Sequence, residues 1–217
     1  MIERPVLRDR VKDLLLQRIA SGALPPGSRI VETRVAQELG TSQAPVREAL
    51  RDLEQLGLVV HEPYRGCSVR APSAAELLEA FPVRAALEAL AARLAAPRVG
   101  EEVLRRLDAL VEAMAEAART GDALGQSHAN AEFHATIVEA AGNATLTRQW
   151  SLLEPFARTY LTVTRAHVDL AALAARHAPI VAALRARDGT AAAAAMETHL
   201  AEASRLLAEA PDQEHAA

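Results

Sequence analysis

Apolar residues in the first 57 positions recur every three or four residues, which is the spacing of one face of an α-helix. The pattern predicts three helices, near residues 6–22, 31–40 and 41–57, and each of them ends on a glycine. A Pro-Pro-Gly turn separates the first helix from the second, because neither residue type continues a helix.

The pattern changes in residues 58–72, where short β-rich runs flank a tight turn at Pro63 to Gly66. We therefore predict two strands joined as a hairpin. Three helices followed by a two-stranded wing are the layout of a winged helix-turn-helix.

From Ser73 onward the chain is rich in Ala and Leu, keeps a helical spacing of apolar residues and has no strand signal. Pro82 and Pro179 each lie inside an expected helix, and each should kink that helix or mark a nearer start. The breaks predict about six helices, near residues 73–96, 101–119, 123–141, 144–166, 170–187 and 190–209. The expected fold class is mainly α, with a winged helix in residues 1–72 and an all-α bundle in residues 73–217.

Composition narrows the class of protein. Half of the 217 residues are hydrophobic and only 3% are aromatic, a balance that favours helices. No run reaches the roughly 18 apolar residues of a membrane span, and the first residues lack the apolar core of a signal peptide. A single cysteine, Cys67, rules out an internal disulfide framework and suits a reducing compartment. We expect a soluble cytoplasmic protein.

The net charge of −4 by itself argues against a protein that binds nucleic acid. However, residues 1–72 hold 11 Lys and Arg against 9 Asp and Glu, whereas the remainder holds 13 against 19. This mild contrast indicates two parts with different roles.

The third predicted helix has an apolar face and, opposite it, a polar face that carries Gln43, Arg47 and Arg51. An isolated helix of this kind is usually an ordinary surface helix. This one follows closely on another helix and precedes the hairpin, which is the position of a recognition helix in the DNA major groove. Arginine suits phosphate or guanine, and Gln43 can pair bidentately with adenine. Arg65, at the hairpin tip, could reach the flanking backbone or the minor groove.

The stretch from Leu24 to Val69 resembles the DNA-binding domain of the GntR superfamily of bacterial transcription regulators. Its most specific parts are "PVREAL", then "L..LGLV" and "RG..V". The resemblance implies DNA contacts by Arg34, Ser42, Gln43, Arg47, Arg65 and Gly66. The family commonly has Ser-Arg-Thr-Pro-Val-Arg where this chain has Ser-Gln-Ala-Pro-Val-Arg. Because one arginine and one hydroxyl are missing, we expect an unusual operator or weaker binding.

Three histidines, His134, His177 and His199, each lie on the apolar face of a different predicted helix. A lone histidine in such a place is usually a core residue with one hydrogen bond. Three buried imidazoles need partners, and converging ring nitrogens in a bundle core fit a metal ion. Asn130, one turn before His134, could offer its side-chain oxygen as a fourth ligand. Zinc suits imidazole ligands, and nickel or another divalent ion is the alternative.

The segments that hold these histidines resemble the FCD-type ligand-binding domain of the FadR branch of the superfamily, so the resemblance covers about residues 8–205. In that domain an Asp and three His commonly hold a metal that helps to bind a small carboxylate. Asn130 stands where the Asp is usual, which removes a negative charge and should lower metal affinity. Arg84 matches an arginine that often faces the cavity and could bind the carboxylate of an effector. Its alternative is a salt bridge to Glu88 on the same helix.

Three function classes follow. The leading hypothesis is a ligand-responsive regulator, a homodimer that represses from a double-stranded DNA operator and is released by a small organic acid. Dimerisation is expected because two winged helices reach paired half-sites about one helical turn apart. The competing class is a metal-dependent enzyme that activates water with the three histidines, but Glu132 and Glu139 point away from His134 and leave no evident general base. The third class is a DNA-binding protein whose bundle serves only as a dimerisation scaffold.

Overall fold

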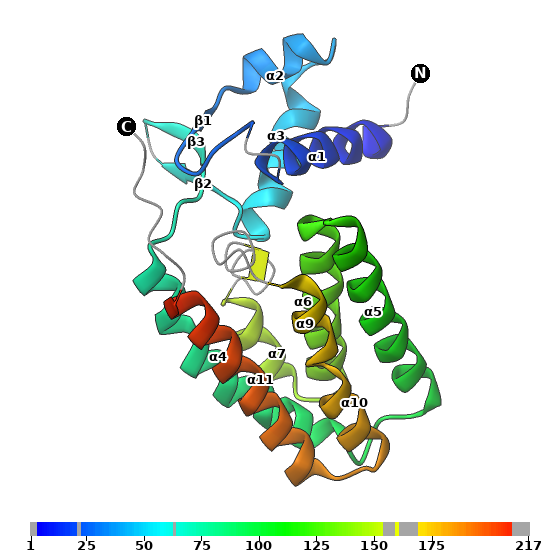
Figure 1. Cartoon of the computed structure of the whole chain (residues 1–217). Coiled ribbons are helices and arrows are strands. Elements are labelled where there is room, and N and C mark those ends of the chain that lie inside the picture. Colours follow the sequence, from blue (N-terminus) through cyan, green and yellow to red (C-terminus); the bar gives the residue numbers. More distant parts are fainter. Residues whose placement is uncertain (1–3, 21–22, 63, 154–158, 161–168, 210–217) are drawn as a thin grey trace. The chain divides into compact units, whose positions relative to one another are not determined.

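The computed structural model describes residues 4–20, 23–62, 64–153, 159–160 and 169–209 (Figure 1). The chain divides into two compact units, Met1–Pro72 and Ser73–Ala217, and each is described here by itself. Among the described residues, none of the helices combines the length and the apolar character that crossing a membrane requires.

The first unit contains three helices and a small antiparallel sheet (Figure 1). The helices are α1 (Arg4–Ala20), α2 (Glu32–Glu38) and α3 (Gln43–Gln55), and the strands are β1 (Arg29–Ile30), β2 (Val59–Glu62) and β3 (Gly66–Val69). The strand order is β1-β3-β2, with His61 opposite Cys67 and Arg29 opposite Ser68.

The prediction of a two-stranded wing is therefore incomplete, because β1 adds a third strand to the sheet. This strand has only two residues, and two residues show no alternation that a sequence pattern could reveal. It pairs with β3 and so ties the segment after α1 to the hairpin.

The apolar face of α3 forms the centre of the first unit. Val46, Leu50 and Leu53 are fully buried there, and α3 packs against α1, whose Val11 and Leu15 are also fully buried. Each such side chain contributes about 1.5–3 kcal/mol through its burial. The packing fixes the rotation of α3, so that Arg47 and Arg51 face outward.

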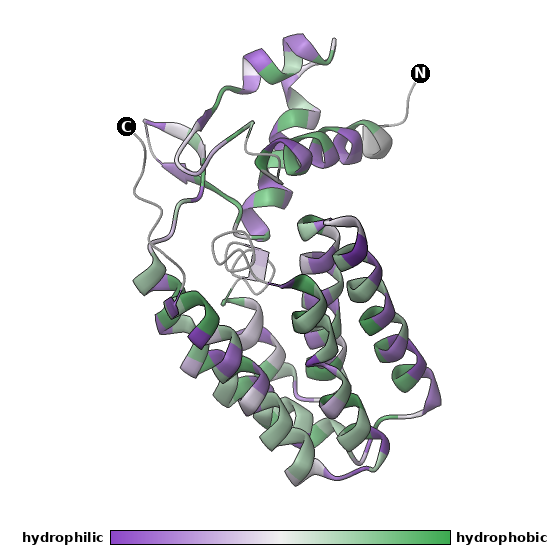
Figure 2. Ribbon diagram, in the orientation of Figure 1, coloured by the Kyte–Doolittle hydropathy of each residue, from purple (hydrophilic) through white to green (hydrophobic). Residues whose placement is uncertain are grey.

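The second unit is entirely helical in its described part and contains seven helices. They are α4 (Ala74–Ala95), α5 (Glu101–Thr120), α6 (Ala123–Ala140), α7 (Ala144–Ser151), α9 (Leu170–Ala175), α10 (Ala178–Arg185) and α11 (Gly189–Glu209). Figure 2 shows alternating hydrophilic and hydrophobic bands along α5, as expected for a helix with one exposed face.

Two of the predicted helices differ from the structure. The helix expected over 144–166 ends at Ser151, where a turn follows, and residues 154–158 and 161–168 lie outside the described residues. The helix expected over 170–187 is broken in two, with His177 as the N-cap of α10 and Pro179 in its first turn. Proline is tolerated there because the first amides of a helix have no partner within it. In contrast, α4 continues through Pro82.

Helix α6 contacts both α4 and α5, and α4 also packs along α11. The fully buried Phe133 and Ile137 of α6 and Met196 of α11 fill the space between these helices. This packing brings three segments together that are distant in the sequence, namely α6, the break before α10, and α11.

Candidate functional site

The three predicted histidines converge inside the helical unit. His134 comes from α6, His199 from α11 and His177 from the break before α10. One ligand atom from each ring lies within 4.8 Å of the others. The exposed fractions are 1% for His134, 0% for His177 and 6% for His199. The rings thus form a single buried cluster, with centroids between 4.4 and 5.7 Å apart.

The backbone holds His177 in one orientation. Its Nδ1 lies 3.1 Å from the carbonyl oxygen of Leu173 and 3.2 Å from that of Ala174. A carbonyl only accepts hydrogen bonds, so Nδ1 carries the proton and Nε2 keeps its lone pair. Asn130 donates to this Nε2 from its Nδ2, 3.1 Å away. Burial, followed by the neighbouring His134, lowers the pKa of His177 to about 3, so the ring is neutral near pH 7.

Glu88 of α4 contacts His134, a link that the sequence did not reveal. Its Oε2 lies 2.6 Å from Nδ1 of His134, an ion-pair distance at which the ring is not aligned for a regular hydrogen bond. Arg84 Nε donates to Oε1 over 2.9 Å, and Trp150 Nε1 donates to the same oxygen over 2.8 Å. Burial raises the pKa of Glu88, but the charge of Arg84 and the contact with His134 outweigh it and hold this pKa well below its ordinary value.

In the neutral imidazole of His134, a carboxylate this close to Nδ1 favours the tautomer with the proton on that nitrogen, and Nε2 then has a lone pair. This Nε2 and Nδ1 of His199 are buried and have no hydrogen-bond partner among the described residues. Leaving such atoms unpaired costs about 1–3 kcal/mol each. The pKa of His199 is also well below its ordinary value, chiefly because of burial and then because of His177.

These features fit a metal ion. The rings of His134 and His177 each turn one nitrogen to a carboxylate or a carbonyl, which is the usual way of orienting metal-binding histidines. The ligand nitrogens lie within 4.8 Å of one another, so one ion could contact all three after small shifts of the rings. Asn130 would present Oδ1 in place of Nδ2 after a half-turn of its amide.

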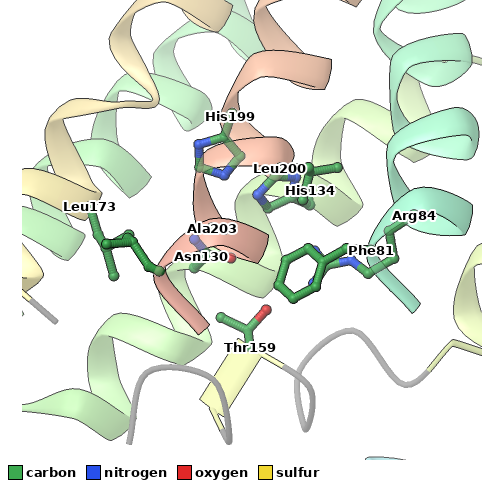
Figure 3. Close-up of a pocket in the computed structure, with 10 residues that line it drawn as sticks. Phe81, Arg84, Asn130, His134, Thr159, Leu173, His199, Leu200 and Ala203 are labelled. Atoms are coloured by element: carbon green, nitrogen blue, oxygen red, sulfur yellow. The ribbon is translucent and has the colours of Figure 1, made fainter. Parts of the chain in front are cut away.

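A cavity of about 40 Å³ adjoins the histidines, which is room for about three water molecules. The lining residues are Phe81, Arg84, Asn130, His134, Thr159, Leu173, His199, Leu200, Ala203 and Leu206. Figure 3 shows His134 and His199 on one side of this space, with Leu173 opposite Phe81 and Arg84. Arg84, Asn130, His134, Thr159 and His199 supply the polar side chains of a lining that is otherwise apolar.

Arg84 forms the salt bridge to Glu88 that was one of its two alternatives, and it also faces the cavity. Only 4% of the residue is exposed. Among the described residues, the only hydrogen bond of the guanidinium group runs from Nε to Glu88. The two Nη groups are thus the donors that a ligand in the cavity could use.

The predicted DNA-binding residues lie at the surface of the first unit. Arg47 has a side chain that is 59% exposed, contacts Glu32 over 2.6 Å and donates to Gln43 over 3.1 Å. Ser42 is the exposed N-cap of α3. On α3, then, the structure brings Gln43 and Arg47 into direct contact.

The other predicted DNA contacts lie on α2 and on the hairpin. Arg34 is exposed on α2 and pairs with Glu38 over 3.2 Å. Arg65 is 83% exposed and pairs with Glu62 over 3.2 Å, next to Gly66 with its φ of 85°. Tyr64 is a residue that the sequence analysis missed: it is fully exposed at the turn and has a φ of 66°, which is unusual for a tyrosine.

Comparison with known proteins assigns each of the two units to a known domain family. Residues 7–69 match the family described as "Bacterial regulatory proteins, gntR family", and residues 79–202 match the FCD domain. A protein of Paenarthrobacter nicotinovorans, named as a probable D-xylose utilization operon transcriptional repressor, is 38% identical over 92% of this chain and 88% of its own length. This chain belongs to the gntR family of bacterial regulatory proteins.

Solved structures support the same fold for this gntR-family regulator. McbR/YncC of E. coli has a TM-score of 0.72 at 24% identity, over 96% of this chain and 99% of that one. A GntR-type regulator of Rhodococcus sp. RHA1 has a TM-score of 0.74 at 24% identity, over 94% and 99%. The FadR-like combination of a gntR DNA-binding domain with an FCD domain, expected from the sequence, is confirmed. Two of the relatives, from P. nicotinovorans and E. coli, are named as a transcriptional repressor and a transcriptional regulator.

Proposed function

We propose that this gntR-family regulator binds its operator as a homodimer and is released by a small organic acid, which binds in the FCD domain beside a divalent metal ion. The observation that carries the proposal is the buried histidine cluster next to a cavity. Its unpartnered nitrogens, Nε2 of His134 and Nδ1 of His199, are costly unless a ligand uses them.

Asn130, His134, His177 and His199 would hold the metal, with zinc or nickel as the ion suited to these ligands. A bound divalent ion supplies a positive charge that attracts carboxylate oxygens. Glu88 and the carbonyl groups of Leu173 and Ala174 orient the histidine rings from behind.

Arg84 would bind the carboxylate of the effector through its Nη groups, because Nε is already engaged by Glu88. The apolar part of the lining, which includes Leu173, Leu200 and Leu206, would contact the rest of the molecule. The relative from P. nicotinovorans is named for D-xylose utilization, so sugars and sugar acids belong in the ligand screen beside simple carboxylates.

Arg47 and Gln43 would read base edges, while Arg34, Ser42, Arg65 and Gly66 would fix the position of the unit on the DNA backbone. In the free protein Arg47 contacts Glu32 at the surface. DNA binding would exchange this carboxylate for a base or a phosphate. Such an exchange is inexpensive, because an exposed ion pair contributes only about 0–1 kcal/mol.

Dimerisation would use an apolar strip on α4. Val83 and Leu90 are 48% and 45% exposed, with the exposed Ala86 between them on the same face of the helix. Burying this strip against a second copy would remove it from water. Replacing Val83 and Leu90 by Glu should convert the dimer to a monomer in light scattering. The same change at the exposed Thr190 of α11 should leave the dimer intact.

The geometry gives little support to enzymatic activity at the histidine cluster. Within the described part of the chain, Glu88 is the carboxylate that contacts the histidine cluster, and Arg84 and Trp150 hold it in its ionised form. A carboxylate held in this way is a poor general base.

The experiment combines metal analysis with DNA binding. The purified protein should contain about one divalent ion per chain after zinc loading, and a set of small acids should weaken its binding to operator DNA. The variant His177→Ala should lose both the metal and the response while keeping its helical circular-dichroism spectrum. A folded variant that keeps both properties would show that the cluster is only part of the core.

A further inference from the structure

Asn130 leaves the histidine cluster without a charged ligand. Among the described residues, the group of His, Cys, Asp or Glu side chains that could hold a metal consists of His134, His177 and His199, with no carboxylate among them. A histidine binds a metal ion as the neutral imidazole, and an asparagine amide carries no charge. A divalent ion bound by these side chains would therefore retain its full charge of about +2.

Glu88 does not compensate this charge, because Arg84 already neutralises it. The two side chains are 2.9 Å apart and only 5% and 1% exposed. Oε1 of Glu88 also accepts from Trp150, and Oε2 faces His134. The pair contributes no net charge to the site, and an uncompensated charge in such a buried place is strongly unfavourable.

An anion in the adjoining cavity can supply the missing charge. Asn130, His134 and His199 line this cavity together with Arg84, so a carboxylate there would lie against both the proposed metal ligands and a guanidinium group. The same carboxylate bound without the metal would meet only the Arg84–Glu88 pair, whose charges cancel. Each ligand therefore provides the charge that the other one needs.

We propose that Asn130 makes the metal ion and the organic acid bind as a pair, so that the regulator senses the acid only when the metal is present. The inference rests on the proposed function and adds a regulatory rule to it. Because binding linkage is reciprocal, the factor by which acid raises metal affinity equals the factor by which metal raises acid affinity.

Asn130→Asp is the matched variant, since it changes the charge of this position and hardly its size. An aspartate would supply the anion within the protein and so remove the need for an acid from solution. The variant should bind zinc tightly by itself, and added acid should change this affinity by less than about twofold. In the wild-type protein, the same acid should raise zinc affinity at least tenfold.

The measurement is zinc affinity by competition with a chromogenic chelator at matched free zinc, with acetate or malonate added. Acetamide and malonamide serve as uncharged controls of similar shape and should have no effect. The reciprocal titration of acetate and malonate into wild-type protein by calorimetry, with zinc or with EDTA, tests the same factor without any variant.

The outcomes separate the two proposals. The wild-type protein could bind zinc equally well with and without the acids, and bind the acids equally well with and without zinc. This result would overturn the pairing and leave the metal site in place. If neither the wild-type protein nor a folded Asn130→Asp variant binds zinc under any of these conditions, the metal site and the pairing both fail. An acid-dependent gain that persists unchanged in Asn130→Asp would also contradict the role given to Asn130.

Discussion

Two ion pairs of the same chemistry lie in opposite surroundings in the two units. Arg47 and Glu32 are 2.6 Å apart at the surface of the first unit, with 59% and 26% of their side chains exposed. Arg84 and Glu88 are 2.9 Å apart inside the second unit, with 5% and 1% exposed. Water and salt screen the first pair, which therefore contributes about 0–1 kcal/mol, whereas each charge of the second pair depends on its partner.

The difference in exposure between the two ion pairs shows how one chain holds two kinds of charged site. Arg47, which we propose to contact DNA, is useful when its protein partner is easily exchanged. Arg84, which we propose to bind the effector, is useful when it stays fixed and ionised. The surface pair is an exchangeable contact, and the buried pair is part of the structure that positions His134.

The largest expected effect comes from breaking the buried pair. Arg84→Ala should lower the free energy of unfolding of the helical unit by about 3–5 kcal/mol, because Glu88 would keep a buried charge without its partner. Urea denaturation followed by circular dichroism measures this loss. The double variant Arg84→Met with Glu88→Leu should recover most of it, since no unpaired charge then remains. A loss below about 1 kcal/mol in the single variant would contradict the assigned role.

A second prediction concerns pH. The pKa of His177 is lowered to about 3 and that of His199 is also lowered, so the unfolded chain binds protons below about pH 6.5 that the folded protein does not bind. Stability should therefore fall with decreasing pH, by about 1.4 kcal/mol for each histidine per pH unit below 6.5. Glu88, whose pKa is depressed, adds stability that is present above pH 4.5 and is lost as the pH falls further.

Urea unfolding midpoints at pH 7.5, 6.5 and 5.5 test this dependence. His177→Phe should flatten the curve by the share of one histidine. A wild-type protein that is equally stable at pH 7.5 and 5.5 would show that the cluster becomes protonated without cost.

The third prediction addresses the exposed pair. Arg47→Ala should weaken operator binding by about 1–3 kcal/mol if the side chain reads a base, and stability should hardly change. Arg93→Ala, on the exposed face of α4, is the control that should bind DNA normally. Fluorescence anisotropy with labelled operator gives both affinities. Unaltered DNA binding by the Arg47 variant would remove α3 from the recognition role.

The smallest effect is expected for Glu32→Gln. Removing this carboxylate frees Arg47 and takes a negative charge from the DNA-facing surface, so binding at low salt should strengthen by up to about 1 kcal/mol. The gain should shrink as salt is added. If the variant instead binds DNA more than tenfold weaker, Glu32 holds Arg47 in its binding position and the pair is not exchanged.

The sequence predicted elements with strong periodicity better than the contacts between them. The rotation of α3 followed from Val46, Leu50 and Leu53, because apolar spacing alone determines which face is buried. The two-residue strand β1 carried no such signal. Likewise, the Pro179 position allowed either a kink or a new start, and the structure shows the new start at His177.

The histidine cluster was accessible from the sequence because each ring lies on an apolar face, and apolar faces meet in a core. The role of Glu88 was not accessible. Its spacing to Arg84 indicated a salt bridge within one helix, but its contact with His134 depends on how α4 packs against α6. Trp150 reaches Glu88 from α7, again through tertiary packing alone.

The measurement that tests the central claim most directly is anomalous X-ray diffraction from crystals of the zinc-loaded protein at the zinc absorption edge. The account predicts one strong peak per chain, bonded to His134 through Nε2, to His177 through Nε2 and to His199, with the Asn130 side-chain oxygen as the fourth protein ligand. No peak among the three rings, or zinc bound only at surface residues, would contradict it.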